Sequence, residues 1–224
     1  MAPGELTCGE AATSAGWEYG CEHNVWGAPW KNIMRKEIMK RTFDILLSMM
    51  LMCILGVPML LIAFLVKCTS KGPVLYWSNR IGRNNRVFRM PKFRTMSVHT
   101  PAVATHLLEK PDNYLTPIGP VLRRLSLDEL PQLWSILKGE MSFVGPRPAL
   151  FNQYDLIELR TQRNIHGLIP GITGWAQING RDDLPIPIKV DYDEYYLRNQ
   201  SFLFDLYIIL MTVFKVLRRE GVRH

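Results

Sequence analysis

The longest apolar stretch of the chain spans residues 45–66, which are 22 positions without a charged side chain. As a helix it would extend about 33 Å, against a hydrocarbon core of about 30 Å. Pro58 lies inside the stretch and favours a kink, because proline removes a backbone donor and clashes with the preceding turn. The arm before Pro58 reaches only about 20 Å and is too short to cross. The pattern therefore predicts a membrane-embedded helix interrupted at Pro58.

Basic residues flank this apolar stretch on both sides. They are Lys31, Arg35, Lys36, Lys40 and Arg41 before it, and Lys67, Lys71, Arg80 and Arg83 after it. A helix that crosses a membrane should carry a one-sided positive excess, so this symmetry favours both ends on the same side. We interpret residues 37–68 as a re-entrant helical hairpin. A kinked spanning helix and a buried helix of a soluble protein are the alternatives.

Downstream of the apolar stretch, short apolar segments alternate with turn-forming residues. Residues 74–77 and 86–90 predict two strands of a hairpin around a turn at 82–85. Residues 150–166 predict a helix, and residues 202–217 predict an amphipathic helix that either lies in the membrane interface or packs as an ordinary core helix. The resulting fold class is α+β and predominantly helical.

The charge balance indicates an anionic partner. The 224 residues include 27 Lys and Arg against 20 Asp and Glu, a formal net charge of +7, and 47% hydrophobic residues exclude wholesale disorder. Residues 67–108 contain no acidic side chain. Such a cationic strip suits anionic headgroups, substrate phosphate, or both. Because no nucleic-acid-binding module is recognisable, nucleic acid is not an expected partner.

The most informative polar motif contains the adjacent carboxylates Asp128 and Glu129. Ser126 and Glu129 have the spacing of a capping box, and Pro131 is tolerated near a helix start, so both carboxylates are expected in a first helical turn. The helix dipole there would favour their ionised forms. Ionised carboxylates beside Arg123 would suit a phosphate-directed nucleophile or a magnesium ligand. A capped structural helix explains the same pattern.

Several motifs follow one another in a fixed order along the chain. They are 92–96 (KFRTM), 123–133 (RRLSLDELPQL), 137–148 (LKGEMSFVGPRP), 170–177 (PGITGWAQ), 179–181 (NGR) and 192–196 (YDEYY). In order and spacing, from about Lys40 to the C-terminus, the chain resembles the bacterial sugar transferase family, the monotopic phosphoglycosyl transferases. Val57 before Pro58 departs from the Ser-Pro that is common in this family.

The resemblance implies an enzyme that transfers a phosphosugar from a UDP-sugar to polyprenyl (undecaprenyl) phosphate and releases UMP. It implies a ping-pong reaction in which Asp128 is the nucleophile and carries the phosphosugar as a covalent acyl phosphate. Glu129 is then its partner in metal binding or acid–base chemistry, and Mg²⁺ is the expected cofactor, held by Asp128 and Glu129. Such an enzyme catalyses the first membrane step of glycoconjugate or polysaccharide assembly.

The same resemblance implies which residues bind substrate. The expected set is Lys92, Arg94, Arg123, Arg147, Gln177 and Asp193. Arg147 lies between two prolines and would bind a diphosphate or uridine through both guanidinium arms, or else pair with a local carboxylate. Asp193 matches an acidic position of the family and is expected in the metal or active-site network.

The resemblance also implies a monotopic protein of the bacterial inner membrane. Residues 1–36 are expected to form a weakly structured extension, 37–68 the re-entrant hairpin with its break at Pro58, and 69–224 a catalytic domain with interfacial helices on the cytoplasmic face. Inner-membrane lipid is thus an expected partner. A noncatalytic, membrane-anchored basic adaptor that binds lipid or nucleic acid is the alternative function. The sequence does not specify the sugar or the oligomeric state.

Overall fold

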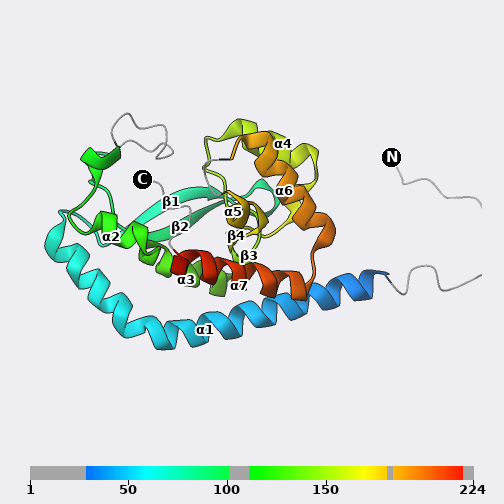
Figure 1. The fold of residues 1–224 in the computed structure, drawn as a ribbon, viewed down its shortest axis with the longest axis horizontal. Helices are drawn as coiled ribbons and strands as arrows, with labels where there is room; N and C mark the ends of the chain where they lie inside the picture. Colours follow the sequence, from blue (N-terminus) through cyan, green and yellow to red (C-terminus); the bar gives the residue numbers. More distant parts are fainter. Residues whose placement is uncertain (1–28, 101–110, 181–183, 219–224) are drawn as a thin grey trace, which may run out of the picture. The chain divides into compact units, whose positions relative to one another are not determined.

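A computed structural model describes residues 29–100, 111–180 and 184–218 (Figure 1). Most of the predicted extension, 1–36, lies outside the described residues. The chain divides into two compact units, Met1–Arg35 and Lys36–His224, and the account below concerns the second. The described residues are mostly helical with two small sheets, as the α+β prediction requires.

The elements follow one another in an irregular alternation of helices and strands. The α-helices are α1 (Pro29–Thr69), α2 (Gly119–Arg124), α3 (Leu133–Lys138), α4 (Tyr154–Gln162), α5 (Trp175–Asn179), α6 (Ile186–Asn199) and α7 (Phe202–Arg218). The strands are β1 (Leu75–Ile81), β2 (Val87–Phe93), β3 (Ser142–Val144) and β4 (Gly171–Thr173). Short 3-10 helices are η1 (Arg83–Asn85), η3 (Pro111–Tyr114), η4 (Leu127–Gln132) and η5 (Ile165–Gly167).

Helix α1 is continuous through Pro58, where the sequence predicts a helix, a break and a second helix. Figure 1 shows it as one curved helix. A proline removes one hydrogen bond and bends a helix, and the apolar residues on both sides of Pro58 keep helical geometry. The predicted interruption is therefore wrong at the level of secondary structure.

Most of the apolar surface of α1 is not covered by protein. The segment Arg35–Thr69 is long and apolar enough to cross a membrane, with a mean hydropathy of 2.7, and only 11% of its most apolar part is buried. Leu60, for example, is 72% exposed, and Val57 and Phe64 are similarly open. A contiguous apolar surface of this kind indicates association with a membrane.

Three residues within little more than one turn, Lys40, Arg41 and Asp44, fasten α1 to the rest of the unit just before the apolar part. The Lys40 Nζ donates to the carbonyl of Val144 at 2.9 Å and pairs with Asp205 of α7 at 2.6 Å. Arg41 donates to the last carbonyls of α3, and Asp44 accepts from the amide of Phe143 at 3.1 Å. Figure 1 accordingly shows α3 and α7 running along α1.

The other end of α1 packs against the same unit. Ile62 and Val66 are buried in a cluster with Phe93 of β2 and Leu122 of α2. The start and the end of the apolar segment therefore both contact one folded body.

The predicted hairpin is confirmed and its strands are longer than expected. Strands β1 and β2 pair antiparallel, from Leu75 opposite Phe93 to Ile81 opposite Val87. At the turn Asn84 and Asn85 adopt φ of 56° and 58°, a conformation that asparagine tolerates better than most residues. The hairpin carries the cationic strip into the site described below.

A second sheet, which the sequence analysis missed, pairs β3 with β4 in parallel. The two segments touch because glycines face each other: a Cβ on Gly145 would lie 2.3 Å from the carbonyl oxygen of Ile169, and one on Gly171 would lie 2.2 Å from the amide nitrogen of Gly145. Strands of three residues leave no periodic signal. This contact holds the loop that follows β3.

Two helix predictions meet different outcomes. The single helix at 150–166 is wrong in extent, since α4 ends at Gln162 and Asn164 adopts φ of 59° before η5. The helix at 202–217 is confirmed as α7. Ile208 is fully buried in a core cluster, which supports the core-helix alternative, while Leu203 and Leu210 face outward; a position in the membrane interface stays a prediction.

Candidate active site

The adjacent carboxylates Asp128 and Glu129 lie in the first turn of η4, as predicted, and η4 leads directly into α3. The predicted capping box does not form. Ser126 adopts φ of 55° and its side chain makes no cap hydrogen bond; its backbone carbonyl accepts from the Glu129 amide at 3.3 Å. The Glu129 side chain is thereby available for contacts with other segments.

Glu129 joins three parts of the chain. Its Oε1 lies 2.7 Å from the Lys92 Nζ, at the end of β2, and 3.3 Å from an Arg147 nitrogen, in the loop after β3. Burial opposes ionisation of Glu129, but the two cations outweigh it and hold the pKa of this carboxyl well below its usual range. Glu129 is therefore an anion at neutral pH.

Asp128 behaves differently although it is the next residue. It is 8% exposed, and burial raises the pKa of its carboxyl, with Lys92 and Arg123 opposing that rise and Glu129 adding to it. The expectation that the helix end favours ionisation of both carboxylates is thus wrong for Asp128. The loss of hydration dominates there, and the dipole of one short turn is small beside it.

Two of the predicted substrate-binding arginines also support local structure. The Arg123 Nε donates to the Thr95 hydroxyl at 3.0 Å; burial lowers the pKa of its guanidinium, and the nearby charge of Asp128 opposes this. Arg94 is buried and its Nε donates to the carbonyl of Pro73 at 2.8 Å. The structure places Arg123 beside the nucleophile candidate, whereas Arg94 anchors the segment that precedes β1.

Asp193 forms a buried ion pair with Arg160 next to the site. Its carboxylate, 1% exposed, accepts from two nitrogens of Arg160 at 3.0 and 2.6 Å. A third nitrogen of Arg160 donates to the backbone carbonyl of Arg147 at 2.8 Å. Asp193 thus reaches the site through Arg160 and the Arg147 backbone, and its role in substrate binding stays a prediction.

Gln177 lies on α5, and both polar atoms of its amide are buried without a hydrogen-bond partner among the described residues. Its Oε1 sits where a Cβ on Gly174 would come within 2.6 Å. Gln177 is not among the residues that line the pocket at Glu129. Its role in substrate binding stays a prediction.

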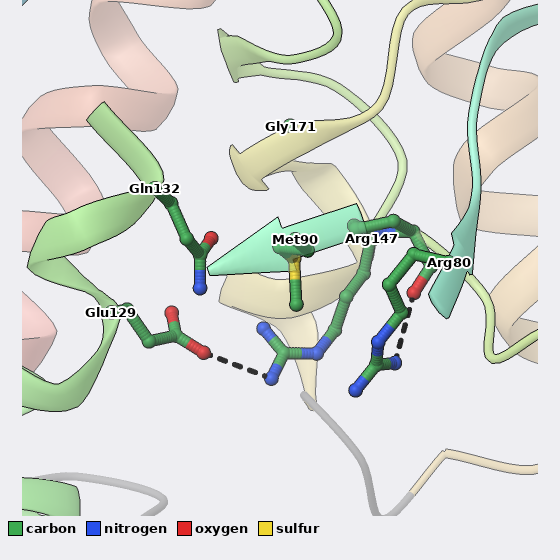
Figure 2. Close-up of a pocket in the computed structure, with 7 residues that line it drawn as sticks. Arg80, Met90, Glu129, Gln132, Arg147 and Gly171 are labelled. Atoms are coloured by element: carbon green, nitrogen blue, oxygen red, sulfur yellow. Dashed lines mark hydrogen bonds and ion pairs between the residues drawn. The ribbon is translucent and has the colours of Figure 1, made fainter. Parts of the chain in front are cut away.

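A narrow pocket, too small for a water molecule in this structure, lies beside Glu129 (Figure 2). It is lined by Arg80, Met90, Glu129, Gln132, Arg147, Pro148 and Gly171. Figure 2 shows Glu129, Gln132 and Arg147 pointing toward one another across this space, with the Arg80 guanidinium beside them. The sequence analysis did not single out Gln132. Its position three residues after Glu129 was the available signal, because that spacing puts two side chains on one side of a 3-10 helix.

The carboxylates of Asp128 and Glu129 suit magnesium when a phosphate is also bound. Among the described residues no group of three or more His, Cys, Asp and Glu side chains could hold a metal. Magnesium in proteins is commonly held by one or two carboxylates, with substrate phosphates and water completing its shell. Asp128 and Glu129 fit that arrangement once a phosphate is bound, and Lys92, Arg123 and Arg147 would attract such a phosphate.

Residues 35–219 match the family described as Bacterial sugar transferase. A Bacillus subtilis (strain 168) protein named "Uncharacterized sugar transferase EpsL" is 41% identical over 187 residues, which cover 83% of this chain and 91% of that protein. The UDP-N-acetylgalactosamine-undecaprenyl-phosphate N-acetylgalactosaminephosphotransferase of Aeromonas hydrophila is 37% identical over 190 residues, 82% of this chain and 45% of that protein.

The undecaprenyl-phosphate glucose phosphotransferase of Komagataeibacter xylinus is 40% identical over 189 residues, which cover 78% of this chain and 35% of that protein. The chain thus spans less than half of the two relatives whose names state a reaction, and nearly all of the Bacillus protein.

Proposed function

The chain belongs to the bacterial sugar transferase family, a family of undecaprenyl-phosphate sugar phosphotransferases, and on that basis we propose that it transfers a sugar 1-phosphate from a UDP-sugar to undecaprenyl phosphate. The names of two relatives state this type of transfer but different sugars, N-acetylgalactosamine and glucose. The observation that carries the proposal is the buried carboxylate pair Asp128 and Glu129, surrounded by cations from three separate segments.

The reaction has two halves. In the first, a carboxylate oxygen of Asp128 attacks the phosphorus that bears the sugar, a bond from that oxygen to phosphorus forms, and the bond from phosphorus to the bridging oxygen breaks. UMP leaves with the electron pair. In the second, an oxygen of undecaprenyl phosphate attacks the same phosphorus and displaces Asp128 as a free carboxylate, which gives a ping-pong order.

The charges around Asp128 support this role. Attack on a diphosphate brings an anionic nucleophile toward an anionic substrate, and Lys92 and Arg123 reduce the repulsion. Glu129 holds Lys92 at 2.7 Å and so fixes one of these cations. Magnesium held by Asp128 and Glu129 would supply further neutralisation of phosphate charge.

The contacts of α1 support a re-entrant path through one leaflet, with the bend in the region of Pro58. From Lys40 to Val66 a straight helix would rise about 39 Å, enough to separate its ends by a whole bilayer core. Both residues nevertheless contact the same folded unit. Basic residues flank the apolar stretch on both sides, and such residues favour the cytoplasm, so we propose that the catalytic unit, 69–224, lies on the cytoplasmic face of the inner membrane.

Labelling tests this topology. In a variant without native cysteines, Lys36→Cys and Lys71→Cys should both resist a membrane-impermeant thiol reagent in intact cells and react after lysis. Labelling of one position but not the other in intact cells would establish a spanning helix.

The transfer itself is tested with purified protein, magnesium, undecaprenyl phosphate and a panel of UDP-sugars. We expect UMP release with at least one donor and its loss in Asp128→Asn. Asp155→Asn is the matched control, because Asp155 also lies in a first helical turn but is exposed. With donor alone, the intact mass of the enzyme should rise by one sugar phosphate. Full turnover by Asp128→Asn, or an unchanged mass with a working donor, would refute the nucleophile assignment.

A further inference from the structure

Gln132 presents a buried donor without an acceptor. It is the last residue of η4, its side chain is only 2% exposed, and its Nε2 has no hydrogen-bond partner among the described residues. A buried N–H group that is left unpaired destabilises a fold, so nearly all such groups in proteins have a partner. The Gln132 amide nitrogen, like the Gln177 amide, therefore has a hydrogen bond left to donate, and a bound water or a ligand atom can accept it.

The side chains around the Gln132 amide favour an anionic hydrogen-bond acceptor. In Figure 2 the Gln132 amide nitrogen points into the pocket, between Glu129 and the Arg147 guanidinium. Arg80 lines the same pocket from β1, where it donates to the carbonyl of Pro148 at 3.2 Å. An acceptor that reaches Gln132 therefore meets two guanidinium groups, and an anionic oxygen fits best.

The space between the pocket side chains does not admit a water molecule, so an anion enters only when Arg147 turns away from Glu129. The 3.3 Å distance between Arg147 and Glu129 exceeds the roughly 2.7–2.9 Å of a strong charge-assisted hydrogen bond. Glu129 retains Lys92 at 2.7 Å when Arg147 turns away. A phosphate oxygen can thus take Arg147 without leaving Glu129 unpaired.

The pocket lies next to the nucleophile rather than on it. Glu129 lines the pocket, whereas Asp128 does not. The phosphate under attack must lie at Asp128, beside Lys92 and Arg123. A nucleoside diphosphate sugar carries a second phosphate bonded to the first through one oxygen, so the site of that second phosphate must adjoin Asp128, as this pocket does through Glu129.

We propose that Gln132 donates a hydrogen bond to the phosphate that departs with UMP, in a pocket completed by Arg80 and Arg147. This rests on the proposed function and deepens it by assigning a binding site to the leaving group. When the bond to the bridging oxygen breaks, its electron pair stays on the UMP phosphate, whose negative charge grows by one. The amide proton is shared with that phosphate and is not transferred, so the amide stabilises the developing charge.

The test uses UMP itself as the probe. Gln132→Met keeps the length of the side chain and removes the donor, and Gln132→Glu keeps the shape and adds a negative charge. We expect Gln132→Met to raise the inhibition constant of UMP and the KM for the UDP-sugar about tenfold to a hundredfold. The KM for undecaprenyl phosphate should not change. Gln132→Glu should raise the inhibition constant of UMP more than Gln132→Met does. Gln162→Met, on the exposed face of α4, is the control.

The outcomes separate this inference from the proposed function. If wild-type protein releases no UMP from any UDP-sugar, the proposed function fails. If wild-type protein releases UMP and both Gln132 variants keep the wild-type inhibition constant, the inference alone is overturned, as it is by a change confined to the lipid acceptor. Thermal unfolding checks that the variants fold; should they not, Arg80→Met measures the same pocket and must also weaken UMP inhibition.

Discussion

Replacement of Asp193 by asparagine probes how the Arg147 loop is held. Asp193 is 1% exposed and Arg160 is 8% exposed, and the two side chains are joined at 2.6 and 3.0 Å. Burial outweighs the attraction of Arg160 and raises the pKa of the Asp193 carboxyl. The pair as a whole therefore adds little net stability, but each partner depends on the other. In Asp193→Asn the arginine stays protonated and loses its counter-charge.

The expected loss of stability follows from the unpaired charge of Arg160. Removing one partner of a buried ion pair typically destabilises a protein by about 3–5 kcal/mol, because the remaining charge is neither hydrated nor neutralised. For a folded unit of this size each kcal/mol lowers the Tm by about 2–4 °C, so we expect a fall of about 6–20 °C. UMP release should fall as well, since Arg160 also fixes the carbonyl of Arg147.

Thermal unfolding followed by tryptophan fluorescence in one detergent measures the effect. Glu194→Gln is the matched control: it is the next residue of α6, and its ion pairs with Arg163 and Arg198 are on the surface, where such pairs contribute little. Equal and small decreases in Tm for the two variants would refute the reasoning.

A double variant separates stability from positioning. Arg160→Met combined with Asp193→Leu leaves no buried charge, so its Tm should recover most of what Asp193→Asn loses. UMP release should not recover, because the hydrogen bond to the Arg147 carbonyl is absent. Recovery of both would show that Arg160 has no positioning role.

Two further predictions concern the carboxylate pair and the glycine contact. Lys92→Met removes a cation that lowers the pKa of both Asp128 and Glu129, so the acid limb of the pH profile of UMP release should move to higher pH. Lys92→Arg keeps the cation and should leave that limb at the wild-type pH. An acid limb that does not move in Lys92→Met would contradict the electrostatic role of Lys92. Gly145→Ala puts a Cβ 2.3 Å from a backbone oxygen and should cost about 1–3 kcal/mol or more in thermal unfolding. Gly167→Ala has no atom within 4 Å of the new Cβ and should change stability by less than about 0.5 kcal/mol; equal effects would argue against the close contact.

The sequence by itself determined the features that depend on neighbouring residues. The apolar composition of 45–66 specifies a membrane-length helical segment, the asparagines at 84 and 85 specify the hairpin turn, and the periodicity of 202–217 specifies α7. The position of Asp128 and Glu129 in a first turn was equally local, since Pro131 restricts where the helix can begin. The family motifs added an expected chemistry to these residues.

Tertiary structure decided everything that depends on burial and on contacts between distant segments. Glu129 meets Lys92 from 37 positions earlier in the chain and Arg147 from 18 positions later, and Asp193 is 33 positions from Arg160. Burial raises the pKa of both adjacent carboxyls, and the directions differ because Lys92 and Arg147 pair directly with Glu129 after folding. No local pattern encodes these quantities, because hydration and charge at a site are set by whichever segments pack around it.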